Sequence, residues 1–383
     1  GHNSLDLAAS SVTLTSTARD VMLINLDTTL PITNISTASN IVIDTTLPTI
    51  TSITSSTPNG SYKAGYNISV NINFSEQITV VGTLNVNLDT GGVVMISAFT
   101  GTTATGTYTV QGGHTSSDLT ATSVTITNTV RDIALNDLSL TLPGINIATG
   151  SDIVIDTTTP TITSITSSTL NGSFKAGDTI PVRINFSEQI TVVGTMSVNL
   201  DSGGVAAISA FTGTTATGIY TVQDGHTSSD LTASSVTITN TARDLALNNL
   251  DLTLPGINIA TNSNIVIDTA IPTITSISSS TPNGSYTTGA NISIRVNFSK
   301  AITLTGTMSV NLDSGGICAI SAFVGTTATG IYTVLIGQNS SDLTATSIVV
   351  NGTARDSALN NLNTTLPGTN IATNSNIVID TTI

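Results

Sequence analysis

Apolar and polar residues alternate along much of the chain. In the stretch Asn67–Phe74 (NISVNINF), the apolar side chains Ile68, Val70 and Ile72 fall on one side of an extended backbone, and Asn or Ser falls on the other. Alternation with a period of two is typical of a half-buried antiparallel strand and not of a helix. Thr is β-branched, is abundant here, and suits the solvent-facing side of a strand without adding charge. The pattern therefore predicts an all-β fold.

The same sequence returns at a fixed interval. The segment IVID ends at Asp44, Asp156, Asp268 and Asp380, so that successive copies are 112 residues apart. Other landmarks, such as NFSEQITVVG and SSDLTATS, recur in the same register. A period of this length exceeds the short repeats of solenoids and equals a whole sandwich domain. We therefore expect tandem domains arranged as an extended rod.

The repeat sets the expected domain boundaries. Residues 44–155, 156–267 and 268–383 are predicted to be three successive repeats, and residues 1–43, which match 113–155, to be the C-terminal part of a preceding one. Such a part cannot bury its own inward faces and leaves sheet edges open. We expect the chain to be an excerpt of a longer protein. Further protein, either the missing front half or a neighbouring chain, is expected to hold this segment.

Turn-forming residues separate seven predicted strands within residues 44–155. The turns include Pro58-Asn59-Gly60 and Asp89-Thr90-Gly91-Gly92, with a further turn at Gly101. The strands are predicted at 48–54, 66–74, 82–88, 93–99, 106–111, 122–127 and 152–155. Seven short strands with regular turns fit an immunoglobulin-like β-sandwich.

Composition narrows the class of function. The 383 residues include 9 Lys or Arg and 23 Asp or Glu, for a formal net charge of −14, which excludes a basic nucleic-acid-binding protein. The single cysteine, Cys318, cannot form an intrachain disulfide. No apolar run reaches the roughly 18–20 residues of a membrane span, and no basic segment precedes a hydrophobic one at the N-terminus. Any secretion signal or anchor is expected outside this stretch.

Strand direction predicts that three carboxylates meet at one end of each repeat. Because strands run alternately up and down, Glu76 after the second predicted strand falls at the same end as Asp44 in the linker and Asp132 in the long loop 128–151. Asp89 and Asp118 fall at the opposite end. Clustered carboxylates repel one another unless a cation, a hydrogen-bond donor or spacing relieves them.

Calcium suits such a cluster because it takes six to eight oxygen ligands, including carboxylates and backbone carbonyls. We expect one Ca²⁺ to stiffen each linker, with the ligand sets Asp44, Glu76 and Asp132, then Asp156, Glu188 and Asp244. The third copy has Asp268, Lys300 and Asp356, where an ammonium group can take the place of a cation. The alternative is that these aspartates only form turns, and that Arg131 and Asp132 form a local ion pair.

Other candidate residues are interpreted structurally. His2, His114 and His226 recur, but Gln338 stands in their place in the third copy, which favours surface loop positions. Cys318 replaces Ala206 and Val94 of the other copies and fits a small apolar strand position. An isopeptide bond between Lys63 and Glu76 is excluded because an extended strand separates them by more than about 20 Å.

No catalytic motif stands out, so we do not expect an enzyme. The sequence shows no Ser-His-Asp order, glycine-rich phosphate loop or paired metal-binding histidines. Ice binding by Thr arrays is disfavoured, because the Thr residues alternate with core Ile and Val and form no flat grid.

A succession of short motifs then points to a family. They are Asp156 to Pro160, Asn171-Gly172, Gly177-Asp178-Thr179-Ile180, Phe186-Ser187-Glu188, Asp201 to Gly204, and Arg243-Asp244 with Asn248. The chain resembles the bacterial immunoglobulin-like repeats of very large surface adhesins and extracellular matrix proteins. The resemblance covers essentially the whole chain and implies extender arrays, with calcium at linkers carried by Asp156, Glu188 and Asp244. The chain departs from the pattern at Lys300, and in the long loop, where Asp-x-Ala-x-Asn lacks the family's glycine before the Asn.

Two functional classes remain open. The first is a structural stalk or fibre-forming segment of a bacterial surface or secreted protein, whose partners are neighbouring repeats or further copies packed side by side. The second is a multivalent adhesin module that binds a glycan or protein. Interface energy is concentrated in aromatic and Arg residues. Because none of the three copies has loops rich in these residues, we favour the structural class.

Overall fold

The computed structural model describes residues 1–382. Strands make up 52% of the chain and helices 4%, arranged in several sheets, which confirms the all-β class. The chain divides into two compact units, which are described separately. The first unit comprises Gly1–Thr159 with Leu245–Asn248, and the second comprises the rest of the described chain.

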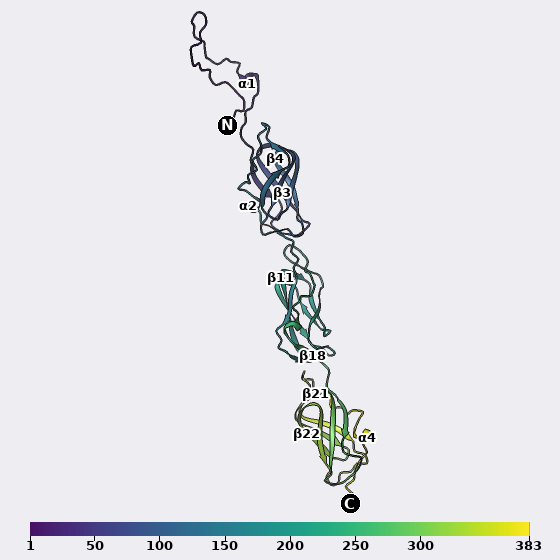
Figure 1. The fold of residues 1–383 in the computed structure, drawn as a ribbon. Coiled ribbons are helices and arrows are strands. Elements are labelled where there is room, and N and C mark those ends of the chain that lie inside the picture. The colour runs from purple at the N-terminus through teal and green to yellow at the C-terminus, as the bar shows by residue number, and fades with distance from the viewer. Residues whose placement is uncertain (383) are drawn as a thin grey trace. The chain divides into compact units, whose positions relative to one another are not determined.

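The first unit contains two short helices and eight strands (Figure 1). The helices are α1 (Ile35–Ala38) and α2 (Ile147–Gly150). The strands are β1 (Ile50–Ser55), β2 (Gly60–Tyr62), β3 (Asn67–Leu88), β4 (Val93–Thr109), β5 (Thr115–Ser116), β6 (Ala121–Ile126), β7 (Thr129–Arg131) and β8 (Ile153–Asp156).

The long strand β3 organises the larger sheet of this unit. It pairs antiparallel with β1, β4, β6 and β7, and its register shifts between Asn73 and Ile78. The separate strands predicted at 66–74 and 82–88 were therefore wrong, as was the break at Gly101, which pairs with Ile78 inside β4. The alternation continues through Ile78 and Val80, which are buried, so the backbone bends through an irregularity without leaving the sheet.

A smaller sheet closes the other side of the unit. Its middle strand, β8, pairs parallel with β2 and antiparallel with β5. Helix α2 is held by Asn146, whose side-chain Oδ1 accepts from the amide of Ala121 at 2.9 Å and whose Nδ2 donates to its carbonyl at 2.8 Å. Asn146 is also the N-cap of α2, and Ile147, the first residue of this helix, is fully buried in the core.

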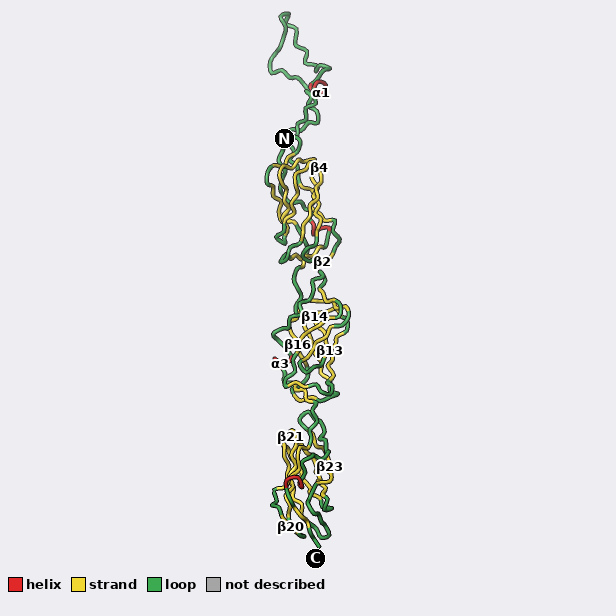
Figure 2. Tube along the Cα trace, turned by 90° about the vertical axis from the view of Figure 1, so that its right-hand side faces the viewer, coloured by secondary structure: helices red, strands yellow, loops and turns green. Residues whose placement is uncertain are grey.

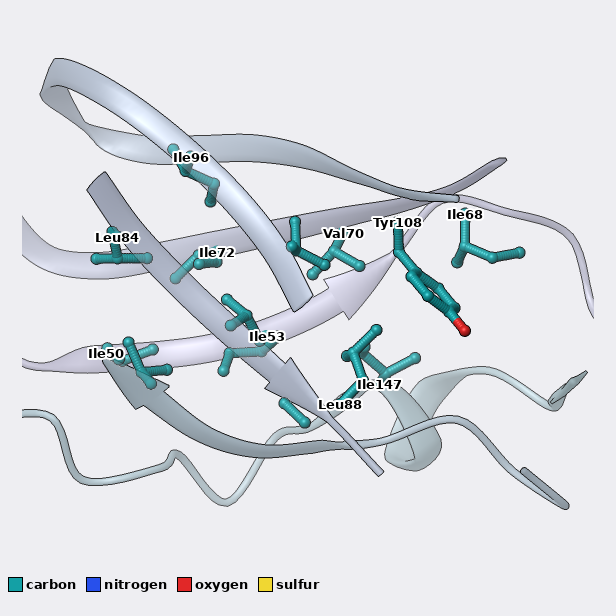
Figure 3. Close-up of a cluster of buried hydrophobic side chains, with 14 of the residues drawn as sticks. Ile50, Ile53, Ile68, Val70, Ile72, Leu84, Leu88, Ile96, Tyr108 and Ile147 are labelled. Atoms are coloured by element: carbon teal, nitrogen blue, oxygen red, sulfur yellow. The ribbon is translucent and has the colours of Figure 1, made fainter. Parts of the chain in front are cut away.

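The core of the first unit is built from the alternating apolar positions of β1, β3 and β4. Figure 3 shows Ile53, Ile72 and Tyr108 in this cluster with Ile147 from α2, all of them at most 2% exposed. Truncation of a buried Ile to Ala typically costs 2–5 kcal/mol. The scarcity of large aromatic residues is thus offset by many β-branched side chains on facing strands.

The second unit contains two further helices and sixteen strands (Figure 2). The helices are α3 (Ile259–Asn262) and α4 (Ile371–Asn374). The first group of strands is β9 (Ile162–Ser167), β10 (Gly172–Phe174), β11 (Thr179–Val193), β12 (Met196–Leu200), β13 (Val205–Ile208), β14 (Phe211–Thr221), β15 (Thr227–Ser228), β16 (Ala233–Ile238), β17 (Thr241–Arg243) and β18 (Ile265–Asp268). The second group is β19 (Ile274–Ser279), β20 (Gly284–Tyr286), β21 (Asn291–Leu312), β22 (Ile317–Thr333), β23 (Ala345–Arg355) and β24 (Ile377–Ile379).

Two separate hydrophobic cores lie in the second unit, one from Ile162 to Ile267 and one from Ile274 to Ile379. In the first, β13 and β14 pair with each other at Ala207 and Ile219. A Cβ on Gly218 would lie 2.9 Å from the Ala207 carbonyl oxygen, so only glycine allows this close approach. Each core cluster of the chain lies within one predicted repeat, while the domain boundaries themselves stay a prediction.

All four helices have four residues, and none in residues 1–382 is long and apolar enough to cross a membrane.

Residues 1–43 expose apolar side chains that their later counterparts bury. Ile35 and Ile41 are each 41% exposed, whereas the equivalent Ile147 and Ile153 are at 0%. The segment still keeps the local contacts of its counterpart, since Asn34 bonds to both backbone groups of Ala9 as Asn146 does to Ala121. What it lacks is a surface equivalent to β1 to β4.

We predict that residues 1–43 become protected when such a surface is supplied. Fusing a copy of residues 156–224 directly before Gly1 places Ile35 and Ile41 against a core like that around Ile147, because Gly225 occupies the position of Gly1 in the repeat. Amide hydrogen exchange at Leu7 and Ile43 should slow by at least about tenfold. A fused segment with Ile180, Ile184 and Val198 changed to Asp is the control. Equal exchange in both fusions would refute the assigned phase of the repeat.

Candidate metal centre

Asp44 stands at the start of the first complete predicted repeat. It directly follows Ile43, whose backbone pairs with Ser4. One carboxylate oxygen, Oδ1, accepts from the amide of Thr46 at 2.9 Å and closes an Asx turn. The turn leaves the second carboxylate oxygen available at the point where the linker enters the sheet.

Asp132 lies in the loop after β7 and is only 4% exposed. Asn136 holds it firmly: the Asn136 amide donates to Oδ1 at 2.8 Å and the Asn136 side-chain Nδ2 donates to Oδ2 at 2.8 Å. The same Nδ2 also donates to the Asp44 carbonyl oxygen at 3.1 Å. A single side chain thus ties the long loop to the linker.

The loop reverses through a left-handed residue, Leu135, with a φ of 69°. Its counterparts Leu247 and Leu359 have φ of 70° and 65°. Glycine, which has no Cβ, adopts positive φ at little cost, whereas Leu does not. The chain therefore carries backbone strain in each copy of this loop.

Glu76 comes from the middle of β3, at its register shift. The prediction that it follows the end of a strand was wrong, because the irregularity between Asn73 and Ile78 lies inside one continuous strand. The amide of Ser75 donates to the Thr49 carbonyl at 2.9 Å, and the Ser75 hydroxyl accepts from the Thr49 amide at 2.9 Å. These bonds fasten the bulged part of β3 to the linker that carries Asp44.

The three carboxylates meet: one oxygen each of Asp44, Glu76 and Asp132 lies within 4.8 Å of the others. Burial, together with the negative charges of Asp44 and Asp132, raises the pKa of Glu76 above its ordinary value. None of the three makes a salt bridge within residues 1–382. The cluster combines three hard oxygen donors with uncompensated negative charge, which suits Ca²⁺.

In the third copy, an amino group occupies the corresponding place. The Lys300 Nζ donates to both carboxylate oxygens of Asp268 at 2.8 Å and to Asp356 Oδ2 at 3.3 Å. It also donates to the carbonyl oxygen of Ala270 at 2.6 Å. Desolvation opposes the charge, but the hydrogen bonds that Lys300 donates to Asp268 and Asp356, together with the negative charges of these carboxylates, outweigh it and raise the pKa of Lys300. This loop and linker, which we call the frame, therefore accommodate a positively charged group surrounded by oxygen atoms of Asp268, Asp356 and Ala270.

The backbone carbonyl in this set was missed by sequence reasoning. Ala270 corresponds to Thr46, so the Thr46 carbonyl is a further candidate donor beside Asp44. Side-chain chemistry alone could not point to it, since every residue carries a carbonyl.

The second predicted trio is divided between the two units. Asp156 ends β8 in the first unit, and its Oδ1 accepts from the Thr158 amide at 2.9 Å. In the second unit, Glu188 lies within β11, and Asp244 follows β17 and is 5% exposed. Glu188 and Asp244 occupy the same places in their secondary structure as Glu76 and Asp132, whereas Asp156 ends a strand and Asp44 follows an isolated bridge.

Neighbouring charged residues have separate roles. The alternative interpretation included a local ion pair between Arg131 and Asp132. Arg131 instead pairs with Asp137, whose Oδ1 accepts from the Arg131 Nε at 2.6 Å. Asp89 is a turn residue: its carboxylate accepts from the Ser116 hydroxyl at 2.6 Å and from the Thr120 amide at 3.2 Å. The Asp89 carboxylate therefore fastens the turn between β3 and β4 to β5 and to the segment between β5 and β6.

Two of the three histidines, His114 and His226, are partly buried and lie beside a buried Tyr. His114 Nδ1 bonds to the hydroxyl of Tyr108 at 2.7 Å, and His226 Nδ1 bonds to Tyr220 at 2.9 Å. Gln338 accepts from the Tyr332 hydroxyl at 2.8 Å in the same way. A side chain that hydrogen-bonds to the hydroxyl of a buried Tyr six residues earlier is the shared feature, which explains why Gln can replace His. The prediction of a plain surface position missed this partner.

Cys318 and Lys63 take up structural positions. Cys318 is fully buried in β22 opposite Val310, and burial raises the pKa of its thiol to about 11, so the predicted apolar strand position is confirmed. Lys63 Nζ donates to the Leu247 carbonyl at 3.0 Å within the first unit. In the second unit, Lys175 Nζ donates to the Leu359 carbonyl at 3.4 Å.

Comparison with known proteins adds no family assignment. A scan against protein-family models found no match, and a search of curated proteins also found none.

Without a divalent cation, the stability of the first unit should fall as pH rises. The raised pKa of Glu76 means that the folded state binds its proton more tightly than the unfolded state does, so folding loses that advantage as pH rises from the ordinary Glu range through the folded pKa. Glu76→Gln should remove this dependence and stabilise the unit by about 0.5 kcal/mol at pH 7. Amide hydrogen exchange at Val130 in EDTA measures the pH dependence and the effect of the substitution, once the rates are corrected for the pH dependence of exchange in an unfolded chain. Identical pH profiles for the two proteins would contradict the prediction.

Relief of the strained loop should be measurable as well. Leu135→Gly removes the Cβ from a left-handed position and is expected to stabilise the loop by about 1 kcal/mol. The stability of the loop is measured by amide hydrogen exchange at Leu138, whose amide donates to the Val130 carbonyl. Leu170→Gly is the control, since Leu170 is exposed but has no positive φ. A loss of stability in Leu135→Gly comparable to that in Leu170→Gly would show that Leu135 is not strained.

Proposed function

We propose that the chain is a structural segment of a bacterial surface or secreted protein. In this proposal, immunoglobulin-like β-sandwich repeats follow one another as an extender, and Ca²⁺ bound at the linkers stiffens them. The observation that carries the cation site is the meeting of Asp44, Glu76 and Asp132 within 4.8 Å at the start of a repeat. The sequence repeat extends the same proposal to Asp156, Glu188 and Asp244.

The position of the cluster supports a mechanical role. Asp44 belongs to the linker, Glu76 to the central strand and Asp132 to the long loop, so a shared cation would fasten three segments that are distant in sequence. The carboxylates repel one another without it, and the linker would then be free to separate from the sheet. Calcium supplies neutralisation and coordination together, because it accepts several carboxylate and carbonyl oxygens.

The extender role rests on repetition. The core positions return at the same interval with few substitutions, as Ile53, Ile165 and Ile277 illustrate by their complete burial. A spacer needs length and uniformity, and near-identical repeats provide both. The proposed partners are neighbouring repeats of the same protein, and further copies in a laterally assembled fibre.

One observation favours the second candidate function, multivalent ligand binding. A shallow groove of about 650 Å³ lies along residues 95–107 of β4, and one of about 460 Å³ lies at the equivalent residues 207–219. Each groove is lined mostly by Thr, Ala and Ser residues around one Phe. Strong interfaces are usually anchored by Trp, Tyr or Arg, so the structural role remains the better proposal.

Calcium should stabilise the first unit through Glu76. At about one hundred times the Kd, a ligand that binds only the folded state adds about 2.7 kcal/mol. We expect amide exchange at Asp132 and Asn136 to slow accordingly when Ca²⁺ replaces EDTA, and the effect to be lost in Glu76→Gln.

Asp137→Asn is the matched control for this experiment. Asp137 is an acid in the same loop, its counterparts are Asn249 and Asn361, and it lies outside the trio. This variant should respond to Ca²⁺ as the unmodified chain does. The absence of any response to Ca²⁺, or a full response in Glu76→Gln, would rule out the proposed site.

A further inference from the structure

The third copy of the acidic cluster has the same frame as the first. Asn360 donates from its amide to Asp356 Oδ1 at 2.9 Å, from Nδ2 to Asp356 Oδ2 at 3.1 Å and from Nδ2 to the Asp268 carbonyl at 2.8 Å. Asn136 makes the corresponding three bonds to Asp132 and Asp44. The loop and linker are therefore held alike in both copies, and the difference lies in the residue that β21 supplies.

That residue changes the charge that the frame must accommodate. Asp44, Glu76 and Asp132 together carry three negative charges when ionised. Asp268, Lys300 and Asp356 together carry a net charge of one negative. The Lys300 amino group is surrounded by four oxygen atoms at 2.6 to 3.3 Å, from Asp268, Asp356 and Ala270. An ammonium group has three protons to donate, and all are used by these acceptors.

The environment is partly protected from water. The side chains of Lys300 and Asp268 are 27% and 25% exposed, and that of Asp356 is 2% exposed. Charge-assisted hydrogen bonds are stronger in such a setting than at an open surface. Removal of one partner from a buried pair is costly because it leaves the other charge uncompensated.

We propose that Lys300 is a built-in cation, which holds Asp268 and Asp356 together and makes this linker independent of divalent metal. The inference rests in part on the proposed function, because it contrasts this linker with the calcium site proposed at Asp44. One chain then carries two kinds of linker. The linker at Asp44 stiffens only when the cation is supplied, and the linker at Asp268 is stiff at all times.

The test compares substitutions of Lys300 in the full chain, with residue-resolved amide exchange at Asp356, Leu359 and Asn360. In EDTA, Lys300→Met should accelerate exchange of these amides by about tenfold, because two neighbouring carboxylates lose their shared cation. Lys300→Arg should keep most of the protection, since it keeps the charge. Lys300→Glu should be as unprotected as Lys300→Met in EDTA and regain protection in Ca²⁺, because it recreates the acidic trio.

The outcomes separate the two proposals. Exchange in Lys300→Met within twofold of the unmodified chain in EDTA would overturn the role of Lys300. A measurable gain in protection at Asn360 of the unmodified chain on addition of Ca²⁺, as large as a measurable gain at Asn136, would also overturn it. If Lys300→Met loses protection in EDTA while Asn136 never responds to Ca²⁺, the built-in cation stands and the calcium site at Asp44 fails. Retained protection in Lys300→Arg distinguishes loss of charge from loss of folding.

Discussion

Backbone hydrogen bonding on both sides of one long strand organises the sheet of the first unit. β3 pairs with β1, β4, β6 and β7, so its residues satisfy their amide and carbonyl groups in two directions while alternate side chains enter the core. β21 plays the same part in the second unit, where it pairs with β19, β22 and β23. This strand cannot be lost without leaving several neighbours unpaired.

The candidate metal centre follows from the irregularity in that strand. At the register shift of β3, pairing with β4 is interrupted, and Ser75 bonds instead to Thr49 beside the linker. Glu76 is thereby brought to Asp44, and Asn136 brings Asp132 to the same place. Three like charges then share a partly buried space, and the frame needs either a bound cation or a positively charged side chain. The proposals for Asp44 and Lys300 assign one of these solutions to each linker.

Prediction from sequence succeeded where physical rules act locally. Alternation identified the strands around Ile53, Val124 and Ile153 to within about two residues, because side-chain direction in a strand depends only on the neighbouring residues. It failed between Phe74 and Gly82, since the irregularity at this point keeps Phe74, Ile78 and Val80 on the buried side and cannot be told from a turn without the partner strand. The hydrogen bond from Tyr108 to His114 was also missed, because the burial of that hydroxyl depends on the surrounding sheet.

By itself, the sequence determined the all-β class, the interval between copies and the acidic residues that recur at that interval. These are properties of composition and of local backbone geometry. Strand direction also placed Asp44, Glu76 and Asp132 at one end of the repeat, and the structure gives their spacing. The tertiary structure alone decided that Asn136 supports them and that Leu135 adopts a left-handed conformation. Asp44 and Asn136 are 92 positions apart in the chain, and contacts of that kind depend on strand register and loop path, which no local pattern encodes.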